Sequence, residues 1–293
     1  MSQNLFRPIV VTVLVLLLAI GSTSLASADK PGPALRAGLR SSDYGISPFP
    51  APTWWVNSIK SMASRFHDST GSSILVVIEI DGETGPGCWA HFPKPDGRTY
   101  PGVRFDATDE FKPLLDAFDR KDIKAWVQVE SSGCDMGMLI DLVMRQYGRH
   151  PSVIGFGVDD EWYLNMDYPD GKPITDAEAR AWVNQVRKYK ADYQVFLKHW
   201  EPSQMPPTYR KGLVFIDDSQ GFDKTGAMMA EFKDWGQYFA PAPVGFQFGY
   251  EEDQSWWSAL KDPPKTIGKG ILARVPNTSD LYWVDFTAYD IWP

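Results

Sequence analysis

Residues 153–161, VIGFGVDDE, are the stretch from which the fold of this chain can be predicted. Successive side chains of a β-strand point to opposite faces, so the even and odd positions of this run lie on different sides. The even positions begin with branched and aromatic residues, whereas the odd positions carry Gly155 and Gly157 and then Asp159 and Glu161. We therefore expect a strand with one apolar face and with two carboxylates leaving the other face at its C-terminal end.

Seven more short runs rich in β-branched and aromatic residues occur along the chain, and helical patterns separate most of them. The predicted strands lie at residues 44–47, 74–80, 124–130, 153–159, 194–199, 213–217, 244–249 and 282–286. The predicted helices lie at residues 52–65, 108–120, 136–147, 175–189, 225–239 and 265–275. Thr108 and Thr175 stand where an N-cap would, each with a glutamate close behind, as in a capping box.

Eight apolar strands that alternate with helices in about 250 residues are typical of a (β/α)8 TIM barrel, which we expect to span residues 43–293 as one domain. A doubly wound open sheet is the main alternative, and it is disfavoured because no glycine-rich phosphate turn follows the first strand. We expect two outer helices to be trimmed. Residues 201–212 contain three prolines, and only a short tail follows residue 286.

The first 28 residues have the pattern of a secretory signal peptide. Arg7 precedes an apolar run at residues 9–20, and Ala26-Ser27-Ala28 is a small-residue cleavage site. The run is too short for a confident membrane span, so we expect a secreted protein with no stable span in the mature chain, an uncleaved anchor being the weaker alternative. Residues 29–42 lack periodicity and are predicted to be a flexible leader.

The chain is acidic, with a net charge of −8 at pH 7, which disfavours nucleic acid as a partner and favours a neutral or cationic substrate. Its two cysteines, Cys88 and Cys134, form an even pair, which in an exported chain more often makes a disulfide than a metal site. We expect one bridge between them. The four histidines lack metal-ligand spacing, so neither a metal nor a cofactor is predicted.

Polar residues gather where the predicted strands end, the edge at which barrels of this kind carry their sites. Solvation of strand ends explains some of them, but a charged residue inside an apolar strand needs a partner or a purpose. The long, glycine-rich segment 81–106 is expected to wall a cleft beside them. The substrate-binding candidates are Gln128, Glu130, Trp162, Tyr163, Lys198, His199, Asp218, Gln247, Tyr250 and Asp285.

Asp159 and Glu161 are the strongest catalytic candidates. Two carboxylates on one strand face, two residues apart, hold one group ionised and raise the pKa of the other, as a general acid near neutral pH requires. An ordinary salt bridge of this pair with Lys198 or an arginine is the structural alternative. Aromatic residues point to sugars as ligands, because twelve tryptophans exceed what a core needs and indole rings stack on pyranose faces.

The segment 155–161, GFGVDDE, resembles the fourth-strand signature of the chitinase family, glycoside hydrolase family 18, or of a related TIM-barrel glycosidase clan. The resemblance implies that Glu161 protonates the glycosidic oxygen and that Asp159 orients an N-acetyl group whose carbonyl acts as nucleophile. It also implies that Trp283 forms the floor of the sugar site. The sequence departs from the signature at Gly157, which replaces the family's first acid, and Asp217-Asp218 lacks the family's preceding tyrosine.

The sequence therefore predicts a secreted, monomeric glycoside hydrolase that acts on a polysaccharide or oligosaccharide. Asp217 or Asp218 is available to orient the substrate or, in a different mechanism, to act as base or nucleophile. A non-catalytic carbohydrate-binding barrel, lectin-like or inhibitor-like, is the alternative, because Gly157 stands where the family has an acid.

Overall fold

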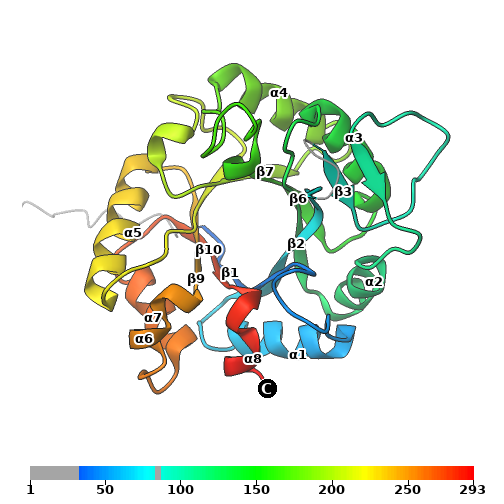
Figure 1. Cartoon of the computed structure of the whole chain (residues 1–293). Coiled ribbons are helices and arrows are strands. Elements are labelled where there is room, and N and C mark those ends of the chain that lie inside the picture. Colours follow the sequence, from blue (N-terminus) through cyan, green and yellow to red (C-terminus); the bar gives the residue numbers. More distant parts are fainter. Residues whose placement is uncertain (1–32, 83–86) are drawn as a thin grey trace, which may run out of the picture. The chain divides into compact units, whose positions relative to one another are not determined.

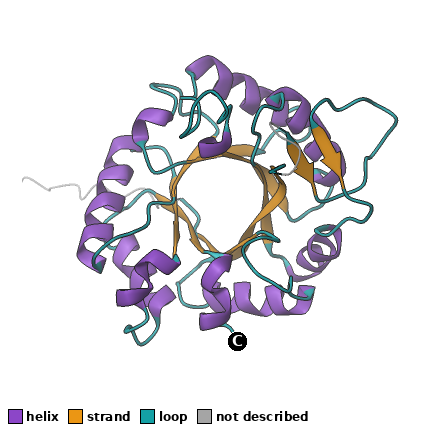
Figure 2. Ribbon diagram, viewed as in Figure 1, coloured by secondary structure: helices purple, strands orange, loops and turns teal. Residues whose placement is uncertain are grey.

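The computed structural model of the protein describes residues 33–82 and 87–293 (Figure 1). In this part of the chain eight parallel strands close into a barrel, which confirms the predicted (β/α)8 architecture (Figure 2). The barrel strands are β1 (Arg36–Ser41), β2 (Thr70–Ile80), β5 (Lys124–Val129), β6 (Val153–Asp159), β7 (Gln194–Lys198), β8 (Leu213–Asp217), β9 (Val244–Phe248) and β10 (Thr278–Trp283). Because β1 pairs with both β2 and β10, the barrel leaves no strand edge unpaired.

Helices surround the ring of strands and cover its outer face (Figure 2). They are α1 (Pro52–Ala63), α2 (Lys112–Lys121), α3 (Met136–Tyr147), α4 (Asp176–Val186), α5 (Thr225–Phe239), α6 (Gln254–Trp257), α7 (Pro263–Leu272) and α8 (Ala288–Ile291). Outward-facing strand residues such as Leu39, Phe156 and Phe246 pack against them in one large apolar core. Within residues 33–82 and 87–293, no helix is long and apolar enough to cross a membrane.

The two trimmed positions are as predicted. Between β7 and β8 the described chain contains only a 3-10 turn, η2 (Pro202–Gln204), because the prolines of this segment cannot continue a helix. After β10 come η4 (Asp285–Thr287) and the four-residue helix α8. Helix α8 lies beside α1, where the indole nitrogen of Trp54 donates a hydrogen bond to the carbonyl of Trp292 (Figure 1).

The first strand is the main error of the sequence prediction. Residues 36–41 were assigned to a flexible leader and residues 44–47 to the strand, whereas β1 is Arg36–Ser41. Two arginines made this run look solvated, but both point into the barrel and are paired there: Arg36 with Asp280 at 2.7 Å and Arg40 with Asp285 at 2.7 Å. The predicted signal peptide and residues 29–32 of the leader lie outside the described residues.

Smaller corrections concern element boundaries. The last strand was predicted at residues 282–286 but ends at Trp283, so Asp285 lies in η4. Thr108 does not cap a helix, because α2 begins at Lys112, whose backbone N–H is bound by the Asp109 carboxylate. The predicted capping box at Thr175 is confirmed, with Glu178 as its second member.

The long segment after β2 adds two strands outside the barrel. β3 (Cys88–Ala90) pairs antiparallel with the end of β2, and β4 (Val103–Phe105) pairs with β3. The predicted disulfide is absent: both cysteines of the described chain are free. The Cys88 thiol donates a hydrogen bond to the Ser131 carbonyl at 2.9 Å, which holds β3 against the segment after β5 without a covalent bond. A hydrogen bond with Cys134, followed by burial, raises the pKa of the Cys88 thiol, so it stays protonated.

Candidate active site

Lys198 is the centre of the charged cluster at the C-terminal mouth of the barrel. It is the last residue of β7, buried, and its register partner on β6 is Asp159. Its Nζ lies 2.8 Å from Asp159 Oδ2 and 2.5 Å from Asp218 Oδ2, where β8 has just ended. Two carboxylates thus share one ammonium group. With both carboxylates ionised, the trio has a net charge of −1.

Buried polar groups hold this trio in place. Gln128 on β5 donates a hydrogen bond from Nε2 to Asp159 Oδ2 at 3.2 Å. Burial raises the pKa of Asp159, and the charge of Lys198 opposes that shift. Despite the same burial, the two carboxylates raise the pKa of Lys198 well above its usual range, so the ammonium form persists at neutral pH.

Glu161 lies beside the trio, where the chain leaves the barrel. The 3-10 turn η1 (Asp160–Trp162) follows β6 directly, and the side chain of Glu161 is half-buried. Burial, followed by the negative charge of Asp159, raises the pKa of Glu161 to about 7. A carboxyl group with that pKa is part protonated at neutral pH, which is the state that a general acid needs.

A cavity of about 400 Å³ opens in front of Glu161. Its wall is mostly polar and is contributed by the segments that follow β6, β7 and β8 together with one residue of α5. The lining residues are Glu161, Trp200, Glu201, Asp218, Ser219, Gln220 and Glu231. Trp200 stacks on His199 at a ring-centroid distance of 4.1 Å, which fixes the orientation of its indole. An aromatic face next to carboxylates is the combination that binds a sugar ring.

Several buried polar atoms at this mouth make no hydrogen bond to any described residue. They are Gln128 Oε1, Asp159 Oδ1, Asp218 Oδ1 and Gln247 Nε2, which come from four different segments of the barrel. Buried polar atoms in native proteins are almost always paired with protein, water or ligand. Their presence together indicates that the mouth is built to receive a polar molecule.

A second charged group lies on the β1 side of the mouth. The guanidinium of Arg40 bonds Asp285 and lies 3.8 Å from Glu130 Oε1, and the hydroxyl of Tyr44 donates to Glu130 at 2.5 Å. Burial and then the charge of Asp159 raise the pKa of Glu130 to about 8. Glu130 is therefore mostly uncharged at neutral pH, and it accepts the hydrogen bond of Tyr44.

The presence of glycine at position 157 has a steric explanation in this barrel. A Cβ atom at this position would lie 2.1 Å from the ring of Phe196, which fills the barrel interior between β6 and β7. The acid that the family 18 signature has here would fit only if the Phe196 ring moved. Lys198, two residues beyond Phe196 on the same strand face, instead supplies the charge that faces Asp159.

The structure brings most of the predicted site residues together. Gln128, Glu130, Asp159, Lys198, Asp218 and Gln247 are buried at the barrel mouth, and Glu161 faces the cavity beside them. Tyr250 joins them through a hydrogen bond from its hydroxyl to Gln247 Oε1 at 3.3 Å. Trp162 is half-buried in η1, next to Glu161. Asp285 is present as the partner of Arg40 and of Ser42, not as a free binding group.

Two predicted residues are corrected because their strands present them to the outer face. Asp217 is fully buried, does not line the cavity, and accepts a hydrogen bond from the Ser219 N–H at 2.9 Å. Its neighbour Asp218 takes the inward position. Trp283 packs against Phe248 and Trp257 outside the barrel, so it is not the floor of a sugar site.

Two other predicted site residues, Tyr163 and His199, make structural contacts instead. Tyr163 points to α4, where its hydroxyl bonds Glu178 and its ring packs edge-on against Trp182. His199 accepts a hydrogen bond at Nδ1 from the Glu201 N–H, so Nε2 carries the proton that it shares with the Asp170 carbonyl. Burial lowers the pKa of His199, which makes it a neutral structural residue that supports Trp200.

Sequence reasoning missed Arg40, Tyr44 and Glu231. Arg40 was assigned to the leader, although the alternation of residues 36–41, with Ala37 and Leu39 between the arginines, was a signal for a strand. Glu231 lies on α5 and lines the cavity, and its carboxylate accepts a hydrogen bond from the Ser219 hydroxyl. A helix residue of this kind carries no signal in the strand pattern.

No protein-family model matches the sequence, and no curated protein matches it. Solved structures with a similar fold include the beta-glucuronidase of Parabacteroides merdae (TM-score 0.50, 14% identity, 85% of this chain and 31% of that chain). A second is the FMN-binding beta-glucuronidase of Facaelibacterium prausnitzii L2-6 (TM-score 0.50, 12% identity, 88% and 38%). A third is a broad specificity endoglucanase from an uncultured bacterium (TM-score 0.46, 12% identity, 86% of each chain).

This chain spans about a third of the length of the two glucuronidases. At such low identity the likeness shows a shared barrel fold. The two glucuronidases are glycosidases with a barrel of this kind, whereas a relation to family 18 in particular is not shown.

Proposed function

We propose that the protein is a glycoside hydrolase in which Glu161 is the general acid. The observation that carries this proposal is a half-buried carboxyl group, with its pKa raised to about 7, that faces a polar cavity beside the two carboxylates that share Lys198. Cleavage of a glycosidic bond needs a proton donor for the leaving oxygen and negative charge near the developing oxocarbenium ion. The similarity of the barrel to known glycosidases supports the same reaction class.

Asp218 is the carboxylate that we assign to the sugar side of the cavity. It lines the cavity together with Glu161, and its Oδ1 has no hydrogen-bond partner among the described residues. Asp159 is the deeper of the two carboxylates on Lys198, and its role in the proposal is to hold Lys198 and to raise the pKa of Glu161. An N-acetylated substrate would supply its own nucleophile, and Asp159 Oδ1 is then the atom available to orient it.

As part of the same proposal, the substrate is a polysaccharide or oligosaccharide outside the cell. The polar wall and Trp200 suit a neutral sugar, and the acidic chain disfavours a polyanionic one. Export rests on the pattern of the first 28 residues alone.

The test is the release of reducing ends from a panel of N-acetylated and unmodified polysaccharides. We expect Glu161→Gln to lower kcat/KM by about 10²–10⁴-fold on the substrate that wild type cleaves, because the amide cannot donate the proton. Glu252→Gln is the matched control, since Glu252 is an exposed glutamate beyond β9 that does not line the cavity. Full activity of Glu161→Gln would overturn the assignment.

A non-catalytic carbohydrate-binding barrel is the second candidate. It is favoured by Gly157, where the ring of Phe196 fills the space of an acid that the family 18 signature contains. Sugar binding by wild type, with no reducing ends released from any polymer of the panel, would support this candidate over the hydrolase. If Asp159→Asn lost activity on N-acetylated polysaccharides but kept activity on the others, the substrate-assisted reaction would be supported instead.

A further inference from the structure

His91 lies at the same end of the barrel, but it belongs to a different cluster. It directly follows β3, and its side chain is only 1% exposed. Its ring packs against Trp89 at 4.7 Å and edge-on against Phe111 at 6.1 Å, so its orientation is set by aromatic contacts. A buried imidazole needs partners for both ring nitrogens.

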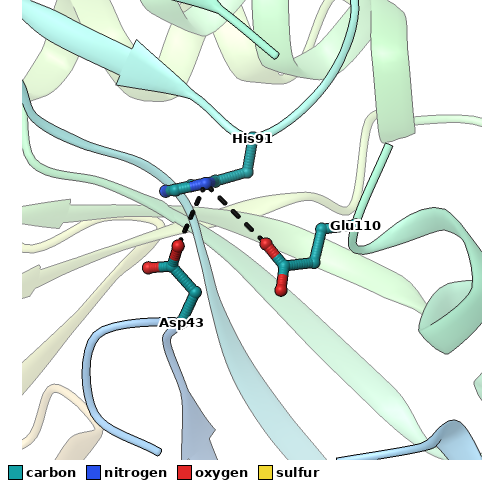
Figure 3. A group of neighbouring side chains, drawn as sticks. All are labelled: Asp43, His91 and Glu110. Carbon is teal, nitrogen blue, oxygen red and sulfur yellow. Dashed lines mark ion pairs between the residues drawn. The ribbon is translucent and has the colours of Figure 1, made fainter. Parts of the chain in front are cut away.

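Carboxylates surround this ring. Nδ1 lies 3.5 Å from Asp43 Oδ2, 3.4 Å from Asp106 Oδ2 and 3.8 Å from Glu110 Oε2. Figure 3 shows Asp43 and Glu110 reaching toward this nitrogen from two separate segments. The other nitrogen, Nε2, lies 3.3 Å from Glu79 Oε1. Asp43 comes from the segment after β1, whereas Asp106 and Glu110 come from the segment between β4 and α2.

The spacing of these groups suits a cation between them. Among the described residues, neither nitrogen of His91 has a hydrogen-bond partner, and Asp43 Oδ1 is also buried without one. Ligand atoms about 2.1 Å from a tetrahedral metal ion lie about 3.4 Å from each other. Nδ1 is spaced in that way from Asp43 and Asp106, and the ligand atoms of Asp43, His91 and Glu110 all lie within 4.8 Å of one another.

The cluster also has an excess of negative charge. Four carboxylates face one imidazole, and in the described part of the chain none of the four forms an ion pair with a lysine or arginine. The side chains of Asp43, Asp106 and Glu110 are 25–29% exposed, so an ion can reach them from solvent.

We propose that His91 Nδ1, Asp43 and Glu110, with Asp106 as a fourth ligand, bind one divalent transition-metal ion, Zn²⁺ or Mn²⁺. One imidazole with carboxylates is a donor set that suits these ions better than Ca²⁺, which prefers oxygen ligands alone. Glu79 would then accept the Nε2 proton of His91, the carboxylate–histidine–metal arrangement that fixes the tautomer of a ligating histidine.

The ion would join the barrel to its added strands. Asp43 follows β1, and Tyr44, next in the chain, bonds Glu130 at the mouth, whereas the remaining ligands come from the excursion around β3 and β4. Bound metal would thereby hold Tyr44 and this wall of the mouth in place. The inference does not depend on the proposed hydrolysis, because binding is measured without substrate.

The experiment is isothermal titration of the chelator-treated full chain with ZnCl₂, MnCl₂ or CaCl₂. We expect one Zn²⁺ or Mn²⁺ per chain, an increase in Kd of at least tenfold in Asp43→Asn and Glu110→Gln, and an increase of about 10–100-fold in Glu79→Gln. Asp43 and Glu110 are partly exposed, so we expect both variants to fold. Circular dichroism checks this.

His150→Gln is the matched control. His150 also lies in a group with two aspartates, Asp116 and Asp119, but its Nδ1 already makes a 2.7 Å hydrogen bond to Asp119. We expect this variant to bind the metal within twofold of wild type. Binding of Ca²⁺ alone, failure of Zn²⁺ and Mn²⁺ to bind at micromolar concentration, or equal losses in His150→Gln and Glu110→Gln would each overturn the proposal.

Discussion

Replacing Asp159 by asparagine is expected to move the pH at which activity falls. Glu161 must be protonated to donate a proton, so kcat/KM of wild type should decline above pH 7, where the pKa of about 7 places its titration. The charge of Asp159 is the second cause of that pKa, after burial. Removing the charge stabilises the ionised form of Glu161, lowers its pKa, and shifts the decline to lower pH.

The size of the shift follows from the spacing of the two groups. Asp159 ends β6 and Glu161 is the second residue of the 3-10 turn η1, so their Cα atoms are at most about 7 Å apart. At an effective dielectric constant of about 20, two charges at that distance interact by about 2 kcal/mol, or between one and two pH units. Lys198, 2.8 Å from Asp159, cancels part of this field. We therefore expect the decline to move by about one pH unit, to about pH 6.

The measurement is kcat/KM against pH on the best substrate, together with a ¹³C NMR titration of the Glu161 carboxyl group, which needs no activity. Asp160→Asn is the matched control. Burial raises the pKa of Asp160 well above its usual range, so this group is already uncharged and its replacement should leave the decline where it is. An unchanged profile in Asp159→Asn, or the same shift in both variants, would refute the electrostatic coupling.

Two further predictions concern stability, measured by urea unfolding. The pKa of Glu130 is raised to about 8 in the folded state, so the stability that its protonated form contributes is full below about pH 4 and is lost as pH rises through 8. Glu130→Gln should therefore flatten the fall in the free energy of unfolding between pH 5 and 8. Parallel curves for wild type and variant would contradict this. Gly157→Asp should lower the free energy of unfolding by about 1–3 kcal/mol or more, because its Cβ would meet the Phe196 ring. Gly226→Asp is the control: a Cβ there meets nothing within 4 Å, so it should lower the free energy of unfolding by less than about 0.5 kcal/mol. Equal losses in the two variants would contradict the clash.

The barrel itself could be predicted from the sequence because its strands are buried on both faces. Such strands are nearly continuous apolar runs, and the runs at residues 153–159 and 213–217 match β6 and β8 at both ends. β1 escaped this reasoning because its inward positions are arginines. Their partners, Asp280 and Asp285, lie more than 240 residues away in the chain, so nothing local shows that the charges are neutralised.

The site could be predicted in part for the same reason. Period-two alternation along β6 placed Asp159 and Glu161 at the mouth, and the structure places both there. Residues at the ends of other strands could not be placed in this way. Trp283 was assigned to the sugar site by the family resemblance, yet it packs against Trp257 outside the barrel. After β8 the sequence left Asp217 and Asp218 both open, and Asp218 is the one that lines the cavity.

The sequence by itself determined the fold class and the strand that carries Asp159, because these depend on residues close together in the chain. Only the tertiary structure decided which charges meet. Lys198 between Asp159 and Asp218, Arg40 against Asp285, and four carboxylates around His91 join segments that are far apart in the chain. Their pairing depends on barrel closure and strand register, which set distances of a few ångströms that no local pattern records.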